Sequence, residues 1–141
     1  MTSAYSKQLF LIPLLALALT SASASAMGMQ NYICLKCRMF LIQTSRPSPN
    51  HCKAGGNHNW FAIGETGPKI HTCLKCRMIV NTAGRPSPNY CTAGGNHNWF
   101  LLGFRGKDNY SCRKCHLRLR TSGRPNTNYC PAGGNHNWFK Y

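Results

Sequence analysis

The chain has 141 residues and a formal charge of +15 at pH 7, because 17 Lys and Arg face only two acidic residues. The two carboxylates, Glu65 and Asp108, lie in separate segments, and the sequence has no Ser-His-acid or phosphate-loop pattern. We therefore expect a non-enzymatic protein whose excess positive charge favours polyanionic partners.

Residues 1–26 have the features of a secretory signal peptide. Lys7 precedes the apolar run LFLIPLLALAL at residues 9–19, and Ala24, Ser25 and Ala26 form a small-residue cleavage pattern. The apolar run is shorter than the roughly 20 residues that cross a bilayer, so a short membrane anchor is the weaker alternative. We expect cleavage after Ala26, an extracellular location and no stable membrane insertion.

The rest of the chain repeats one unit three times. Cys34, Cys73 and Cys112 recur every 39 residues, each opens a C-x2-C knuckle, and each copy ends in GGNHNWF. These limits predict modules at residues 31–61, 70–100 and 109–141. Residues 62–69 and 101–108 contain Gly and are expected to be short linkers outside the core.

Each copy predicts a small, mostly β fold without a helical period. Short strands are expected at residues 39–43, 78–81 and 117–120, and a second strand begins near Asn59 and its equivalents. The Arg-Pro step between them is typical of a turn. The Gly-Gly pair ahead of each His permits a backbone conformation with positive φ.

The cysteines and one histidine of each copy have the spacing C-x2-C-x14-C-x5-H, which is typical of a closed Cys3His zinc site. The twelve expected ligands are Cys34, Cys37, Cys52 and His58, then Cys73, Cys76, Cys91 and His97, and finally Cys112, Cys115, Cys130 and His136. A module of about 30 residues buries too little apolar surface to fold alone, so the metal would supply its folding energy. We expect three zinc ions per chain.

Disulfides are the alternative for a secreted chain. Three cysteines per copy cannot all pair within a copy, and nine cannot all pair within one chain. An oxidised form must therefore leave a free thiol or bond between chains, and it would not explain the spaced histidine. Iron also fits such ligands, but zinc is the usual occupant of a closed site.

Other residues recur at matching places in the three copies. Three Arg-Trp pairs could form an array that stacks on sugars or bases, or each Trp could pack beside its metal while each Arg bonds carbonyls in its own turn. These tentative ligand-binding residues are Arg46, Trp60, Arg85, Trp99, Arg124 and Trp138. The remaining histidines, His51, His71 and His116, recur at no matching place and are expected at the surface.

The knuckle, the Pro-containing excursion and the GG-x-H-x-W ending together resemble small zinc-ribbon modules of uncharacterised bacterial and phage proteins. The resemblance implies three tandem zinc-ribbon-like repeats joined by short linkers, with the four ligands named above in each. Ribbon knuckles often carry Gly after the second Cys, whereas this chain has Arg38, Arg77 and His116. Ribbons serve many roles, so the resemblance implies fold and metal rather than a ligand.

The leading functional hypothesis is a secreted module that binds an acidic glycan, lipopolysaccharide or nucleic acid, for example as an effector acting on another organism. Three loaded sites at −1 each would lower the +14 of the cleaved chain to about +11, which still favours such partners. A cationic antimicrobial protein is an alternative, although no copy has an amphipathic helix. An extracellular zinc-sequestering protein is another, and Asn109 begins a glycosylation sequon that matters in a eukaryotic secretory route.

Overall fold

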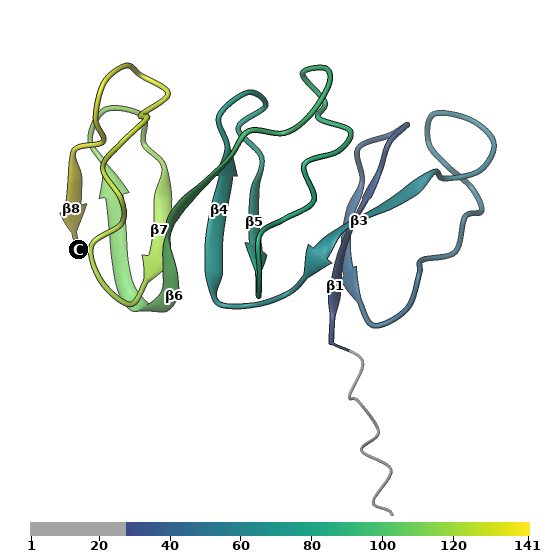
Figure 1. Ribbon diagram of the computed structural model, residues 1–141, viewed down its shortest axis with the longest axis horizontal. Coiled ribbons are helices and arrows are strands. Elements are labelled where there is room, and N and C mark those ends of the chain that lie inside the picture. The colour runs from purple at the N-terminus through teal and green to yellow at the C-terminus, as the bar shows by residue number, and fades with distance from the viewer. Residues whose placement is uncertain (1–27) are drawn as a thin grey trace, which may run out of the picture.

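The computed structural model describes residues 28–141, so the predicted signal peptide lies outside the described residues. Every regular element in this range is a strand, and none of the described residues forms a helix that could span a membrane. The strands are β1 (Gln30–Cys34), β2 (Phe40–Gln43), β3 (Trp60–Glu65), β4 (Lys69–Cys73), β5 (Ile79–Thr82), β6 (Trp99–Cys112), β7 (Arg118–Thr121) and β8 (Trp138–Lys140). The mostly β, tandem-repeat fold is confirmed, and the modules stand side by side (Figure 1).

Each module is a three-stranded antiparallel sheet whose central strand leads into the C-x2-C knuckle. In module 1 the order is β2-β1-β3, and Ile33 of β1 pairs with both Phe40 and Phe61. Module 2 repeats this with β5-β4-β6, and module 3 with β7, the second half of β6 and β8. The strands predicted after the knuckles are present, whereas the central strand was not predicted.

One long strand serves two modules. The first part of β6 pairs with β4 from Trp99 to Phe104, and the part from Arg105 to Ser111 pairs with β7 across a bulge. At the first junction β3 ends at Glu65 and β4 begins at Lys69. Pro68 lies in this gap and has no N–H to extend a ladder, whereas Lys107 stands at the equivalent place in β6.

The prediction that residues 62–69 and 101–108 lie outside the core is wrong. Ile63 and Leu102 are each 1% exposed, and Ile63 belongs to a core cluster that also holds Val80 and Trp99 of module 2. The chain between modules is therefore a packed junction, because its apolar side chains find partners in the neighbouring repeat.

Backbone hydrogen bonds tie the junctions together in the same way twice. The Ser87 amide donates to the Ile63 carbonyl at 2.6 Å, and the Asn126 amide donates to the Leu102 carbonyl at 2.6 Å. A second bond, from Ala83 to Glu65, is matched by one from Ser122 to Phe104, both at 2.9 Å. The modules thus meet through fixed backbone contacts.

Candidate metal centres

Two tight loops bring each set of predicted ligands together. In module 1 the knuckle closes through the Arg38 amide, which donates to the Cys34 carbonyl at 2.9 Å. The second loop closes through the Gly55 amide, which donates to the Cys52 carbonyl at 2.9 Å. Gly55 and Gly56 have φ values of 89° and 61°, so the predicted need for glycine is confirmed, and both other modules repeat it.

The twelve predicted residues form three clusters of three cysteines and one histidine. In each cluster the four ligand atoms lie within 4.8 Å of one another. The first and third cysteine sulfurs are 3.9 Å apart in every module, as for Cys34 and Cys52. The second sulfur lies 3.4 Å from the histidine Nδ1 in module 1 and 3.5 Å in modules 2 and 3.

These distances match a tetrahedral ion with mixed ligands. Bond lengths of about 2.3 Å to sulfur and 2.0–2.1 Å to nitrogen give tetrahedron edges of roughly 3.8 Å between sulfurs and roughly 3.5 Å between sulfur and nitrogen. The donor set therefore fits a metal through three sulfurs and one Nδ1. Four protein donors complete a tetrahedron and leave no position for a catalytic water, so such a metal would be structural.

The sulfurs are not placed for disulfides. A disulfide needs an S–S distance near 2.05 Å, whereas the Cys34 and Cys52 sulfurs are 3.9 Å apart. All nine cysteines, which lie within the described residues, are free thiols in the structure. The first and third cysteine of each cluster are buried, which suits an enclosed metal rather than a reactive thiol.

The protein environment sets different thiol pKa values within one cluster. Burial raises the pKa of the Cys34 thiol, but the amides of Cys37, Lys36 and Asn59 and the His58 ring act against it and lower the pKa to about 5. The amides thus favour a thiolate at this position before any cation arrives.

The opposite holds for the second cysteine of a cluster. Burial, together with the neighbouring sulfurs of Cys112 and Cys130, raises the pKa of Cys115 to about 11. Cys112 itself has a pKa lowered to about 6, because amide donors and His136 outweigh its burial. Two adjacent thiolates are costly until a divalent cation joins them, so metal binding would release the remaining thiol protons.

In all three modules the tryptophan packs beside the histidine ligand. Trp60, Trp99 and Trp138 are 6%, 7% and 4% exposed, and each indole stacks on the histidine two residues before it, with ring centroids 4.5–4.6 Å apart. Each indole N–H donates to a backbone carbonyl of the preceding excursion, such as that of Ser48 at 2.8 Å. These rings therefore cannot serve as exposed stacking platforms.

The arginine of module 1 also makes an internal contact. Arg46 Nη2 donates to the Trp60 carbonyl at 3.1 Å, so it joins the excursion to the following strand rather than bonding within its own turn. Arg85 and Arg124 are exposed at the equivalent places. The Arg-Trp array is thus not arranged as paired cation and aromatic surfaces.

The three histidines outside the clusters differ in burial. His51 and His116 are exposed, as predicted, but His71 is 6% exposed, so the prediction of a surface position is wrong for it. Its Nδ1 lies 3.1 Å from the Thr82 hydroxyl, and burial together with the charges of Lys69 and Arg85 lowers its pKa. The repeat itself could have indicated this burial, because His71 occupies the place of the buried Tyr32 in module 1.

The knuckle lysines hold the glycine loops. Lys75 Nζ donates to the carbonyls of Gly94 at 2.7 Å and Asn96 at 3.1 Å. Lys36 and Lys114 reach the equivalent glycine carbonyls in their own modules. These charges thus support the loop that carries the third cysteine and the histidine.

No family model matches the sequence, and no curated protein or solved structure matches it either. The likeness to zinc ribbons therefore stands on the residues of the three copies alone.

Proposed function

We propose that this chain is a secreted, non-enzymatic protein with one structural zinc ion in each module, and that it binds a polyanionic or glycan partner. The observation that carries the zinc assignment is the donor geometry, three sulfurs and one Nδ1 at tetrahedral spacing in every module. A closed Cys3His set is a common structural zinc site. The leader-like residues 1–26 support secretion.

Metal content is the first test. Native mass spectrometry of the chain after residue 26 should give three zinc ions, and a chelator should remove them with loss of structure, because zinc contributes about 10–16 kcal/mol to folding in small fingers. A His58→Ala variant should hold two ions, since it removes one donor of the first cluster. The matched control is His51→Ala, which changes an exposed histidine of the same module and should keep three. Metal-free protein with paired cysteines would overturn the zinc assignment.

The surface charge supports the proposed partner. Within the described residues the structure gives one ion pair, between Lys140 and Asp108 at 2.9 Å, so most Lys and Arg have no carboxylate nearby. Such an excess of positive charge attracts polyanions over several ångströms, and salt weakens this attraction by screening it. Binding to acidic polysaccharide, lipopolysaccharide and nucleic acid should be compared at low and high salt. No binding to any of them would remove this part of the proposal.

Two other outcomes would redirect the function. Leakage from anionic liposomes would favour a membrane-active antimicrobial protein. Rapid transfer of zinc to a competing chelator would favour zinc sequestration, because closed structural sites release their metal slowly. The amino terminus of the exported protein tests the leader itself, and residue 27 should be its first residue.

A further inference from the structure

The two module junctions carry equivalent grooves. Each groove lies between the knuckle of one module and the loop that carries the third cysteine of the next, and the two volumes are about 630 and 660 Å³. The first is lined by Leu35, Arg38, Asn89, Tyr90 and Asn96, among others. The second is lined by the residues 39 positions later, Leu74, Arg77, Asn128, Tyr129 and Asn135. The same chemistry is therefore presented twice along the molecule.

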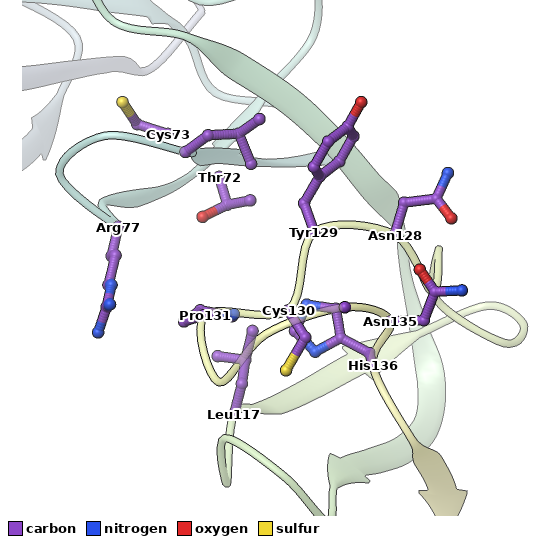
Figure 2. A pocket seen from close by; sticks show the side chains of 12 residues that line it. Thr72, Cys73, Arg77, Leu117, Asn128, Tyr129, Cys130, Pro131, Asn135 and His136 are labelled. Carbon is purple, nitrogen blue, oxygen red and sulfur yellow. The ribbon is translucent and has the colours of Figure 1, made fainter.

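The groups in a groove are spread along its length. Figure 2 shows Arg77 at one end of the second groove and the amides of Asn128 and Asn135 at the other, with Tyr129 along the wall between them. The tyrosine ring is 59% exposed and is braced edge-on by Phe100, with centroids 4.9 Å apart. Tyr90 is 57% exposed and is braced by Phe61 in the same way in the first groove.

The arginines and tyrosines hold an unusual backbone conformation. Arg38 and Arg77 have φ of 60°, and Tyr90 and Tyr129 have φ of 59° and 61°, a region where glycine is the cheaper residue. His51 and His116 have φ of 59° and 58° at the equivalent places outside both grooves, so this conformation belongs to the loops of every module and positions the arginines and tyrosines where a groove forms.

The repeats themselves offer an internal comparison. Module 1 is preceded by no module within the described residues, and its residue at the tyrosine place is His51. Module 3 is followed by none within the same range, and its residue at the arginine place is His116. Arginine and tyrosine thus occur where two modules form a groove.

From these observations we infer that the two grooves are the ligand sites and that they bind an acidic oligosaccharide, one anionic group to each guanidinium. The inference rests on the proposed function and names its partner. An arginine binds a carboxylate or sulfate in a bidentate manner, a tyrosine offers an apolar face with a polar edge, and asparagine amides both donate to and accept from hydroxyls.

The density of charge favours a glycan over nucleic acid. Single-stranded nucleic acid carries one phosphate per nucleotide and is bound in grooves with continuous positive charge. Here the lining of each groove holds one arginine among neutral amides. Lys114, which lines an adjoining pocket together with Arg77, donates to the Gly133 and Asn135 carbonyls of its own loop. Neither Arg38 nor Arg77 forms an ion pair among the described residues, so both are available to a ligand. A glycan whose acidic sugars alternate with neutral ones fits a groove with a single arginine.

The two grooves would act together on one chain. A linear glycan that is long enough to reach both grooves should bind with higher overall affinity, because its second contact is intramolecular. Short oligosaccharides should therefore bind much more weakly than long ones.

The test uses the zinc-loaded chain after residue 26 and measures binding by calorimetry. The probes are a hyaluronan oligosaccharide, which carries one carboxylate per disaccharide, its methyl ester, a galactan oligosaccharide with one sulfate per disaccharide, and oligo(dT) of similar length. The hyaluronan oligosaccharide or the sulfated galactan should bind, and the one that binds more tightly identifies the anionic group. Arg77→Gln should weaken that binding about tenfold, the worth of one charged hydrogen-bonded contact. Arg38→Gln with Arg77→Gln should weaken it further. The charge-matched control Arg120→Gln alters an exposed residue outside both grooves and should change binding little.

The outcomes separate this inference from the proposed function. If acidic polymers bind but Arg38→Gln with Arg77→Gln behaves like Arg120→Gln, the groove assignment is overturned and the proposed function stands. If the methyl ester binds as tightly as the acid, or oligo(dT) binds more tightly than both acidic oligosaccharides, the acidic-glycan assignment is overturned. If none of these probes binds, and lipopolysaccharide does not bind in the salt comparison either, the proposed polyanion function fails together with this inference. Zinc content and circular dichroism of each variant confirm that it is folded.

Discussion

At the scale of single residues, the position after the second cysteine of each knuckle is strained, because its residue has a positive φ in all three modules. His116 has φ of 58°, where a Cβ costs roughly 1–2 kcal/mol. His116→Gly should therefore raise the free energy of unfolding by about 1 kcal/mol, as seen in the urea midpoint of the zinc-loaded protein.

The control for this change keeps the Cβ. His116→Ala retains the strained conformation and should give no comparable gain, so equal midpoints for the alanine and glycine variants would contradict the role of strain. The test also bears on Arg38 and Arg77, which hold the same conformation where they line a groove.

At the scale of elements, the junction glycine sets how closely β6 approaches the turn after β7. A Cβ on Gly106 would lie 2.3 Å from the Cα and the N of Ser122, both backbone atoms that cannot swing away. Gly106→Ala should cost about 1–3 kcal/mol of stability, because the sheet and the turn must move apart. Hydrogen exchange should locate the damage at the amides of Ser122 and Asn126, which donate across this junction.

A neighbouring glycine provides the matched control. A Cβ on Gly123 would meet no heavy atom within 4 Å, so Gly123→Ala should leave both stability and exchange near those of the parent. If Gly106→Ala were equally harmless, the close packing of this junction would not hold in solution. Gly67 and Gly84 offer the same pair at the first junction.

The elements also divide into those that the sequence could predict and those that it could not. The ligand clusters and the strands after the knuckles follow from spacing within one repeat, where the spacing of the metal-ligating side chains and short turns decide the outcome. The central strands and the junctions depend on the next repeat. Ile63 is buried because it packs in one cluster with Val80 of the next module. His71 is buried because β4 pairs with a strand on each side, and neither arrangement can be read from a single repeat.

A pattern across copies held part of the missing information. Ile63 and Leu102 are apolar residues at equivalent places in their repeats. Four residues after each stands a glycine, Gly67 or Gly106, that allows close contact with the next module. The grooves could not be found in this way, because their walls come from two different modules and only the assembled stack brings Arg77 near Tyr129.

At the scale of the whole molecule, the three modules behave as a short stack rather than as separate beads. Phe61 and Phe100 each meet the tyrosine of the following module at 4.9 Å, whereas Phe139 at the same place in module 3 is covered by Arg113, at 5.2 Å, and by Tyr141. In such stacks stability is the sum of module and nearest-neighbour terms. Module 2 has two neighbours in the described chain, and module 3 has one.

This difference predicts unequal effects of removing equivalent ligands. His97→Ala should loosen module 2 and, through Ile63 and the shared strand β6, raise hydrogen exchange in β1 to β3 and in β7. His136→Ala, which removes the equivalent donor, should raise exchange in module 3 and at the second junction while β1 to β3 stay protected. Both variants should hold two zinc ions, so metal loss is matched and only position differs. Exchange confined to the mutated module in both cases would mean that the modules fold independently, and the grooves between them would then lack the fixed walls that a ligand site needs.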